Sequence, residues 1–457
     1  MRKKIIGFLA AGLVLAAPVM AQETSQPTEP AYNCDFQPSS EVGPGKYGRM
    51  STPVTSKFKL AIGGFVRLDY AYNSVNFGKS GSLSPGSGAI PKAGSTAGNQ
   101  EQSIFTARQS RLWLKASGPT FLGAKTSALI EVDFYGDPSY ANEGPEVRMR
   151  HAYATLDWPK TQVLFGQTWD TFGPMAANTI DFRQGSSFGS PNNPRVPQIR
   201  VTQSVDLSQD NALKLVLALQ DPNQDDNNNT MTTGFYSNNV GSAVNVAGRI
   251  MWESKALGGG PGFWGLSLKP LTAGVFGLFG SQKATNLGVG VGDKSVDSWG
   301  AGFYTFVPIL KSKDGMSRSM TMSLEGQAYM AANMSFSSAT SINFVGASTD
   351  PKAARAYGFG AQLNFFPTQD LGVSAGYLRR NAYKYSDYSN VSNFQKYNTL
   401  IFANVSYDLN AAIRVAAEYE YFNTHYGNPA IGASTTTNSD AGSGSANVIR
   451  CALFYFF

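Results

Sequence analysis

The last residues of the chain, Val448–Phe457, form an apolar stretch that ends on an aromatic residue. Because side chains alternate along an extended strand, the odd-numbered residues from Ile449 to Phe457 share one face and Arg450 lies on the other. A soluble protein gains little from such a terminal strand. The closing strand of an outer-membrane β-barrel needs this pattern, since it presents apolar groups to lipid and an aromatic residue to the membrane interface.

The N-terminus supports export. Basic residues at positions 2–4 precede an apolar run over Ile5–Ala17, and small residues lead to Ala21. This arrangement is typical of a secretory signal peptide, so we predict that residues 1–21 are removed. No cysteine follows the predicted cleavage point directly, so we expect no lipoprotein anchor. Together the two ends predict a protein of the outer membrane of a Gram-negative bacterium.

Composition narrows the class further. Without residues 1–21 the chain carries 34 Lys and Arg against 31 Asp and Glu, a net charge near +3, so its charge does not predict nucleic-acid binding. After the signal there is no apolar run of 18 residues, which excludes a transmembrane helix. An aromatic content of 12%, 48 glycines and only 15% charged residues instead suit a membrane barrel.

Two regions follow the signal peptide. Residues 22–57 are rich in Pro, Ser, Thr and Glu and are expected to be a flexible periplasmic leader. Residues 58–457 show no linker and are expected to form one barrel. The two cysteines could pair in an exported protein. We favour two unpaired side chains, because Cys34 lies in the polar leader and Cys451 on the expected lipid-facing side.

The barrel region predicts an all-β, antiparallel transmembrane barrel of about sixteen strands, with fourteen or eighteen as alternatives. Short turns such as 117–119 alternate with long polar loops such as 73–102, which places the turns in the periplasm. The connection 254–269 is too long for a periplasmic turn in this scheme. The predicted strands are 58–72, 103–116, 124–135, 146–157, 161–171, 197–207, 211–221, 244–253, 270–281, 296–309, 319–331, 356–367, 371–383, 396–409, 412–423 and 446–457.

The two faces of these strands differ in polarity. In the first strand Val66 and Leu68 alternate with Arg67 and Asp69, and we expect the charged face to line a water-filled centre. A soluble β-sandwich would reverse the faces, so alternation alone does not decide between the two. The signal peptide and Phe457 favour the membrane barrel. If the last strand closes on the first, Arg450 lies inside, beside Arg67 and Asp69.

Charged residues on the expected inward faces are the candidates for a functional site. The basic residues concentrate in the first six strands, where Lys115 is one of them. Later strands add the acidic candidates Glu325, Glu418 and Glu420. The parity of Arg108 differs from that of Arg111, so one of them points elsewhere or a bulge intervenes. The pore-lining candidates are Arg67, Asp69, Arg108, Arg111, Glu131, Asp133, Arg148, Arg150 and Arg200.

Two interpretations of these charges remain open. They can pair across neighbouring strands and simply stiffen the wall, or they can form a basic wall whose field selects anionic solutes. The third long loop, residues 172–196, contains Asp181, Arg183 and Arg195. It can fold inward and narrow the channel, or remain an ordinary surface loop.

Four segments, on the second to fifth predicted strands, resemble the DcaP-type porins: Phe105–Lys115, Ile130–Gly136, Arg148–Tyr153 and Leu164–Phe172. The resemblance covers about 70 residues closely. It implies a homotrimeric sixteen-stranded channel with an inward third loop and a preference for dicarboxylate-like anions. The positions that it carries over are Arg108, Arg111, Arg148 and Arg150. Members of that family can carry a coiled-coil stalk ahead of the barrel, but residues 22–57 contain no heptads.

These observations predict a passive porin for small hydrophilic, preferentially anionic solutes, in contact with outer-membrane lipids and lipopolysaccharide. The alternatives are a weakly selective general diffusion porin and a surface adhesin or receptor barrel. We expect no catalysis, metal or cofactor. The two histidines, His151 and His425, lie in no recognisable catalytic motif.

Overall fold

The computed structural model describes residues 58–78, 89–136, 145–181, 183–191, 194–221, 244–284, 292–347, 349–388, 391–428 and 439–457. The predicted signal peptide, the leader and Cys34 lie outside these residues. None of the helices in the described ranges is long and apolar enough to cross a membrane.

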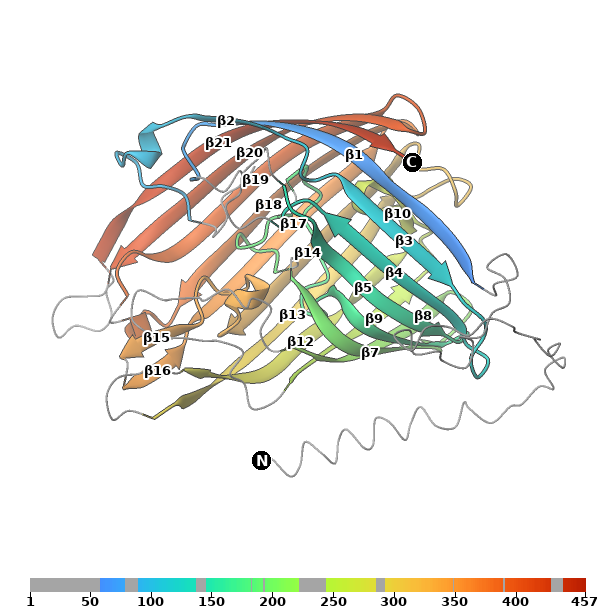
Figure 1. Ribbon diagram of the computed structural model, residues 1–457, viewed down its shortest axis with the longest axis horizontal. Coiled ribbons are helices and arrows are strands. Elements are labelled where there is room, and N and C mark those ends of the chain that lie inside the picture. The colour runs from blue at the N-terminus through green and yellow to red at the C-terminus, as the bar shows by residue number, and fades with distance from the viewer. Residues whose placement is uncertain are drawn as a thin grey trace, which may run out of the picture.

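The chain forms one closed antiparallel β-barrel of sixteen strands, as the alternating pattern predicts (Figure 1). Strands that follow one another in sequence pair side by side, and β1 pairs with β21 to close the sheet. The barrel strands are β1 (Lys59–Asn73), β2 (Gln102–Thr106) with β3 (Arg111–Ser117), β4 (Lys125–Asp133), β5 (Arg148–Asp157), β6 (Thr161–Trp169), β7 (Arg195–Asp206), β8 (Asn211–Gln220), β9 (Asn245–Ser254), β12 (Leu271–Ala284), β13 (Lys294–Leu310), β14 (Thr321–Ala332), β17 (Arg355–Phe366), β18 (Leu371–Tyr383), β19 (Phe394–Asp408), β20 (Ile413–Asn428) and β21 (Ser439–Phe456).

The second strand of the barrel is interrupted. Both β2 and β3 pair with β1, and the residues between them form a turn. In this turn Ser110 Oγ accepts the backbone N–H of Arg67 at 2.9 Å. The interruption resolves the parity conflict between Arg108 and Arg111, because the two residues do not belong to one continuous strand.

The seam between β1 and β21 ends at the C-terminal residue. Gly64 and Phe457 exchange backbone hydrogen bonds of 3.1 and 3.2 Å. Leu453 and Tyr455 are about half exposed on the outer face, whereas Arg450 is only 1% exposed inside. The orientation predicted for the last strand is therefore confirmed. Cys451 is a free, exposed cysteine on the outer face.

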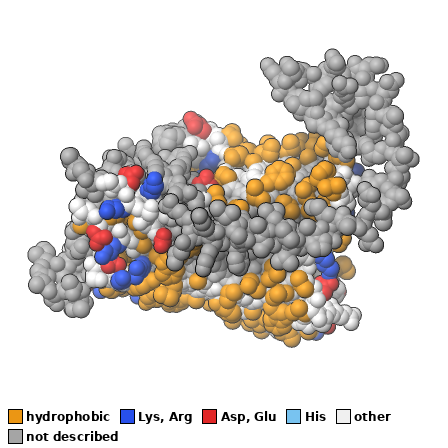
Figure 2. Space-filling view, turned by 90° about the horizontal axis from the view of Figure 1, so that it is seen from below, with side chains coloured by type: hydrophobic (Ala, Val, Ile, Leu, Met, Phe, Trp, Pro, Cys, Tyr) orange, Lys and Arg blue, Asp and Glu red, His pale blue; other side chains and the backbone are white. Residues whose placement is uncertain are grey.

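The outer surface carries a belt of hydrophobic side chains (Figure 2). Charged side chains gather toward one end of the barrel in that view, the end at which β15 (Phe344–Ala347) and β16 (Asp350–Ala353) lie in Figure 1. The C-terminus lies at the opposite end. This distribution is what a barrel in lipid requires, because the hydrocarbon layer excludes charge from its middle.

The connection between β9 and β12 contains its own small elements, at the end of the barrel that bears the C-terminus. They are the short hairpin of β10 (Gly260–Pro261) and β11 (Leu268–Lys269), with the 3₁₀ helix η4 (Phe263–Gly265) at its tip. Three further 3₁₀ helices are η3 (Ala97–Asn99), η5 (Ser335–Ser337) and η6 (Tyr385–Tyr388).

Candidate functional site

The described residues of the segment 170–194, between β6 and β7, lie inside the barrel, and we call them the inner loop. Its backbone N–H groups donate to side chains of strands far from β6. Met175 N lies 3.2 Å from Gln327 Oε1 of β14, and Asn178 N lies 2.7 Å from Gln362 Oε1 of β17. These contacts reach across the lumen, so the loop folds inward. The sequence alone left the direction of this loop open.

Close packing keeps the inner loop against the far wall. Gly189 has a φ of +120°, and a Cβ there would stand 2.7 Å from the carbonyl oxygens of Phe359 and Arg379. Only glycine allows this approach. Phe188 is 2% exposed and packs on Phe422, with ring centroids 4.9 Å apart.

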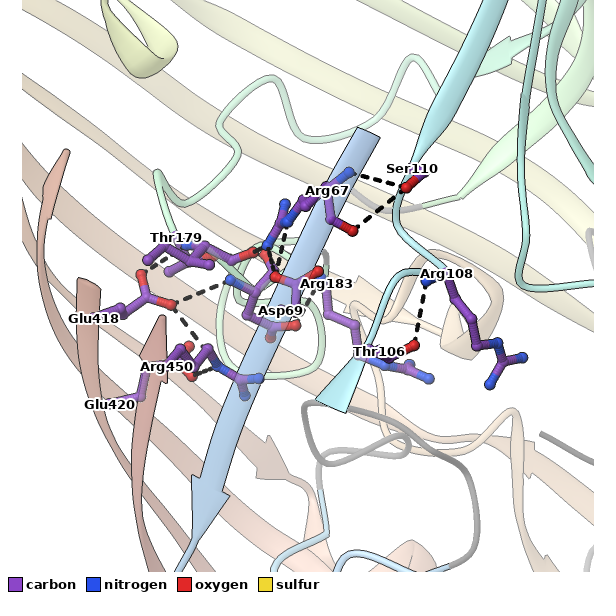
Figure 3. A network of polar contacts seen from close by, with 12 residues as sticks. Arg67, Asp69, Thr106, Arg108, Ser110, Thr179, Arg183, Glu418, Glu420 and Arg450 are labelled. Atoms are coloured by element: carbon purple, nitrogen blue, oxygen red, sulfur yellow. Dashed lines mark hydrogen bonds and ion pairs between the residues drawn. The ribbon is translucent and has the colours of Figure 1, made fainter. Parts of the chain in front are cut away.

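A cluster on β1, β20 and β21 fixes the middle of the inner loop (Figure 3). We call it the anchor cluster: Arg67, Asp69, Glu418, Glu420 and Arg450. Glu418 accepts the backbone N–H groups of the loop at Ile180 (2.8 Å) and Asp181 (3.2 Å). Arg67 donates to the Ile180 carbonyl at 2.7 Å and to Asp69 at 2.8 Å. The sequence-predicted Arg67 and Asp69 therefore hold the loop.

Arg450 completes the anchor cluster from the closing strand. Its Nε lies 2.5 Å from Glu420 Oε2 and 3.9 Å from Glu418 Oε1. Arg183 of the inner loop lies beside Asp69 in Figure 3, and its backbone N–H donates to Asp181 Oδ1 at 3.2 Å. Asp181 is 3% exposed, so these loop residues belong to the anchoring contacts.

A second group of charges lines the wall of β3, β4 and β5. Arg148 donates to Asp133 from Nε (2.9 Å) and Nη2 (2.6 Å). Arg150 bridges Glu131 at 2.6 Å and Asp133 at 2.8 Å. Arg111 lies 3.6 Å from Glu131. We call these five residues the basic wall, in which three arginines share two carboxylates.

Two more arginines lie near the basic wall on β7. The guanidinium of Arg195 stands 5.1 Å above the ring centroid of Trp169. Within the described residues, neither Arg195 nor Arg200 has an ion pair with a carboxylate at 4.0 Å or less. Arg150 of the basic wall lies 5.9 Å from the same ring centroid, so the positive charge of Arg195 stands next to that of the wall. The region therefore carries an excess of positive charge.

Arg108 has a different role. It is 2% exposed, its Nε donates to the Phe134 carbonyl at 3.2 Å, and its guanidinium lies 4.4 Å from the ring centroid of Tyr135. These contacts connect the turn between β2 and β3 to the residues that follow β4.

Sequence reasoning did not single out Arg249. This residue of β9 donates from Nε to the carbonyl of Thr171 and from Nη2 to that of Asp170 at 3.3 Å. It holds the start of the inner loop. Its inward parity, shared with Met251 against the outward Ile250 and Trp252, is the signal that could have revealed it.

Residues of the inner loop, Arg111 of the basic wall and the β9–β12 connection line a half-open cavity of about 250 Å³. Its lining combines charged, polar and apolar side chains: Arg111, Trp169, Pro174, Ala176, Gln184, Phe263, Lys269 and Glu325. In the described part of the chain, no group of three or more His, Cys, Asp or Glu side chains gathers that could hold a metal ion.

No protein-family model and no curated protein matches this chain. Among solved structures, the outer membrane channel DcaP of Acinetobacter baumannii has a TM-score of 0.63 at 19% sequence identity, covering 88% of this chain and 97% of DcaP. The fold is that of an outer-membrane porin. The resemblance to DcaP-type porins is thus confirmed as a likeness of fold.

Two other solved structures share the architecture. An anion-selective porin from Comamonas acidovorans has a TM-score of 0.50 at 11% identity, over 88% of this chain and all 100% of that one. OprB of Pseudomonas putida has a TM-score of 0.50 at 10% identity, over 88% of this chain and 94% of that one.

Proposed function

We propose that this chain is an outer-membrane porin through which small hydrophilic solutes diffuse passively, with a preference for anions. The observation that carries the proposal is the excess of arginine beside the cavity, where Arg111, Arg148, Arg150 and Arg195 face two carboxylates, Glu131 and Asp133. A basic constriction lowers the energy of an anion and raises that of a cation.

The geometry supports different roles for these arginines. Arg148 and Arg150 have their donors fixed by Asp133 and Glu131, so they contribute charge from set positions. Arg111 lines the cavity directly. A guanidinium presents a planar fork that matches a carboxylate and keeps its charge at all working pH values. We infer that Arg111 meets the passing solute first among them.

The resemblance to DcaP-type porins supports dicarboxylates as the preferred anions. The test is block of single-channel current in planar bilayers by succinate, phosphate and a neutral sugar. Block by succinate at the lowest concentration is the expected result. Equal weak effects of all three would favour a general diffusion porin, and a protein without conductance would favour an adhesin or receptor barrel.

We further propose that the loop-bearing end of the barrel faces outward and contacts lipopolysaccharide. On its outer face Arg379 lies 3.9 Å from the ring centroid of Tyr397, which in turn stacks on His425 at 5.1 Å. Lys396 of β19 lies 5.6 Å from the ring centroid of Tyr385. Cationic side chains on the outer face near the loop-bearing end can bind the phosphates of lipid A, because a phosphate accepts several charge-assisted hydrogen bonds.

Native mass spectrometry with bisphosphorylated lipid A tests the lipid contact. Arg379→Ala should reduce the bound fraction, whereas Lys59→Gln, at the opposite end of the barrel, should not. Equal binding by both variants would contradict the site.

The proposal also includes a homotrimer, cleavage after Ala21 and a periplasmic leader over residues 22–57. The trimer is supported by an apolar hollow of about 480 Å³ on the outer face, lined by Leu68, Phe105 and Leu453 among others. Light scattering of the detergent-solubilised protein should give three times the monomer mass. A monomer mass would contradict the trimer.

A further inference from the structure

The connection between β9 and β12, residues 255–270, folds into the barrel, and we call it the inner turn. Its hairpin lies on β13 and β14. Ser323 Oγ donates to the Pro261 carbonyl at 2.7 Å, and Ser312 N donates to the Gly259 carbonyl at 2.9 Å. A Cβ on Gly260 would stand 3.0 Å from Pro308. The wall and the hairpin are therefore in direct contact.

The tip of the inner turn contacts the inner loop. The backbone N–H of Trp264 donates to Asn178 Oδ1 at 3.0 Å. The Nδ2 of Asn178 donates to Asn364 Oδ1 (3.1 Å) and Ser374 Oγ (2.6 Å) on the barrel wall. Trp264 also packs in one apolar cluster with Ile180. Asn178 thus connects the inner loop, the inner turn and the barrel wall. The inner loop and the inner turn stabilise each other through this contact.

The inner turn contributes charge as well as bulk. Glu325 is the only carboxylate among the described residues that line the cavity, and Lys269 of the turn lies 4.0 Å from it. Glu325 is nearly buried and also accepts hydrogen bonds from Tyr304 Oη (2.7 Å) and Gln362 Nε2 (2.6 Å). The Lys269 side chain remains 39% exposed. Its charge offsets Glu325 on the side opposite the basic wall.

The turn also supplies an aromatic side chain to the cavity. Phe263 lines the same space as Trp169, Pro174 and Ala176. These four residues provide apolar surface beside the cations Arg111 and Lys269. A cavity of about 250 Å³ with this lining suits a small anion that carries an apolar body.

We propose that the inner turn is a second constriction element, which together with the inner loop encloses a binding compartment for small carboxylates with an apolar body. Phe263 sets the width of the compartment. Lys269 keeps it favourable to anions by neutralising Glu325. The proposal rests on the proposed porin function and deepens it by adding an apolar body to the features that the channel recognises in an anion.

Bilayer recordings of single substitutions test this inference. Phe263→Ala should raise single-channel conductance and weaken current block by benzoate several-fold, with little change in block by acetate. Phe121→Ala, which removes an exposed phenylalanine from the short turn between β3 and β4, is the matched control. Lys269→Gln should shift the reversal potential toward cation preference, and Lys313→Gln in the β13–β14 turn should not.

The outcomes separate the two proposals. An anion-selective channel in which Phe263→Ala changes neither conductance nor benzoate block would overturn the inner turn as a constriction element. A wild-type channel without anion preference would overturn the proposed function instead, while the conductance of Phe263→Ala would still test the turn. Because a variant can misfold, each is first checked for heat-modifiable migration in gels. A Phe263→Cys, Cys34→Ser, Cys451→Ser variant adds a second readout, since a thiol reagent added to the bathing solution should reduce its current.

Discussion

Glu418 of β20 accepts the backbone N–H groups of Ile180 and Asp181 at 2.8 and 3.2 Å, so a wall residue holds the loop that follows β6. Ile180 and Glu418 are separated by 238 positions in sequence. Asn404 Nδ2 supports the same carboxylate at 2.9 Å. The inner loop therefore depends on a hydrogen-bonded contact that only the closed barrel can form.

Substitution of Glu418 should loosen the inner loop. Glu418→Gln places an NH₂ group opposite one of the two N–H donors, which leaves a buried donor without an acceptor at a cost of about 1–3 kcal/mol. We expect larger and noisier single-channel currents. Glu253→Gln is the control, because Glu253 pairs with Lys214 away from the loop. Currents identical to wild type in size and noise would argue against the anchoring role.

Removal of both Arg148 and Arg150 should reverse the net charge of the basic wall. Asp133 and Glu131 would then lack their main partners, and the wall would carry more negative than positive charge. We expect the Arg148→Ala, Arg150→Ala double variant to lose succinate block and to shift its reversal potential toward cations. Asp133→Asn should move the reversal potential in the opposite direction. Unchanged block in the double variant would place the solute site elsewhere.

Deletion of Phe457 should impair barrel closure. The residue exchanges two backbone hydrogen bonds with Gly64, each contributing about 0.5–1.5 kcal/mol, and the tip of its ring lies near Gly64. We expect a smaller heat-modifiable fraction in outer-membrane extracts. Phe303→Ala, which removes another exposed aromatic from the outer face, serves as the comparison. A deletion variant that assembles as well as Phe303→Ala would show that the last residue is dispensable.

The turn between β13 and β14 should respond to acid. Backbone N–H groups of Ser317 and Met316 donate to Asp314 Oδ1 at 2.7 and 2.8 Å, and they lower the pKa of this carboxyl below its ordinary value. A lowered pKa stabilises the folded turn above the unfolded-state pKa, and this contribution disappears as the pH falls through the lowered value.

NMR titration of the protein in micelles checks the acid response. The Asp314 carboxyl resonance should titrate below the ordinary range for aspartate, and the amide signals of Met316 and Ser317 should follow it. An Asp314→Asn variant should lose that dependence. A titration midpoint at or above the ordinary value would refute the hydrogen-bonded geometry.

Much of the barrel could be predicted because its signal is local. Alternation of apolar and polar residues locates each strand, and turn-forming residues separate them. The inward orientation of Arg450 and the outward orientation of Leu453 follow from parity alone. The interruption between Thr106 and Arg111 was visible only as a parity conflict, because a turn inside a strand changes the phase of the pattern.

The interior could not be predicted in the same way. The inner loop lies inward because Gln327, Gln362 and Glu418 accept its N–H groups, and their proximity arises only when the sheet closes. The inner turn was noticed for its length, but the partners that keep it inside, such as Asn178, are distant in sequence. Long-range contacts of this kind leave no periodic signal.

The reversal potential of the purified wild-type protein in a planar bilayer, under a potassium chloride gradient, tests the central claim most directly. An excess of arginine beside the cavity predicts a potential whose sign corresponds to chloride permeating faster than potassium. A potential of the opposite sign, or one at zero, would contradict an anion-selective channel.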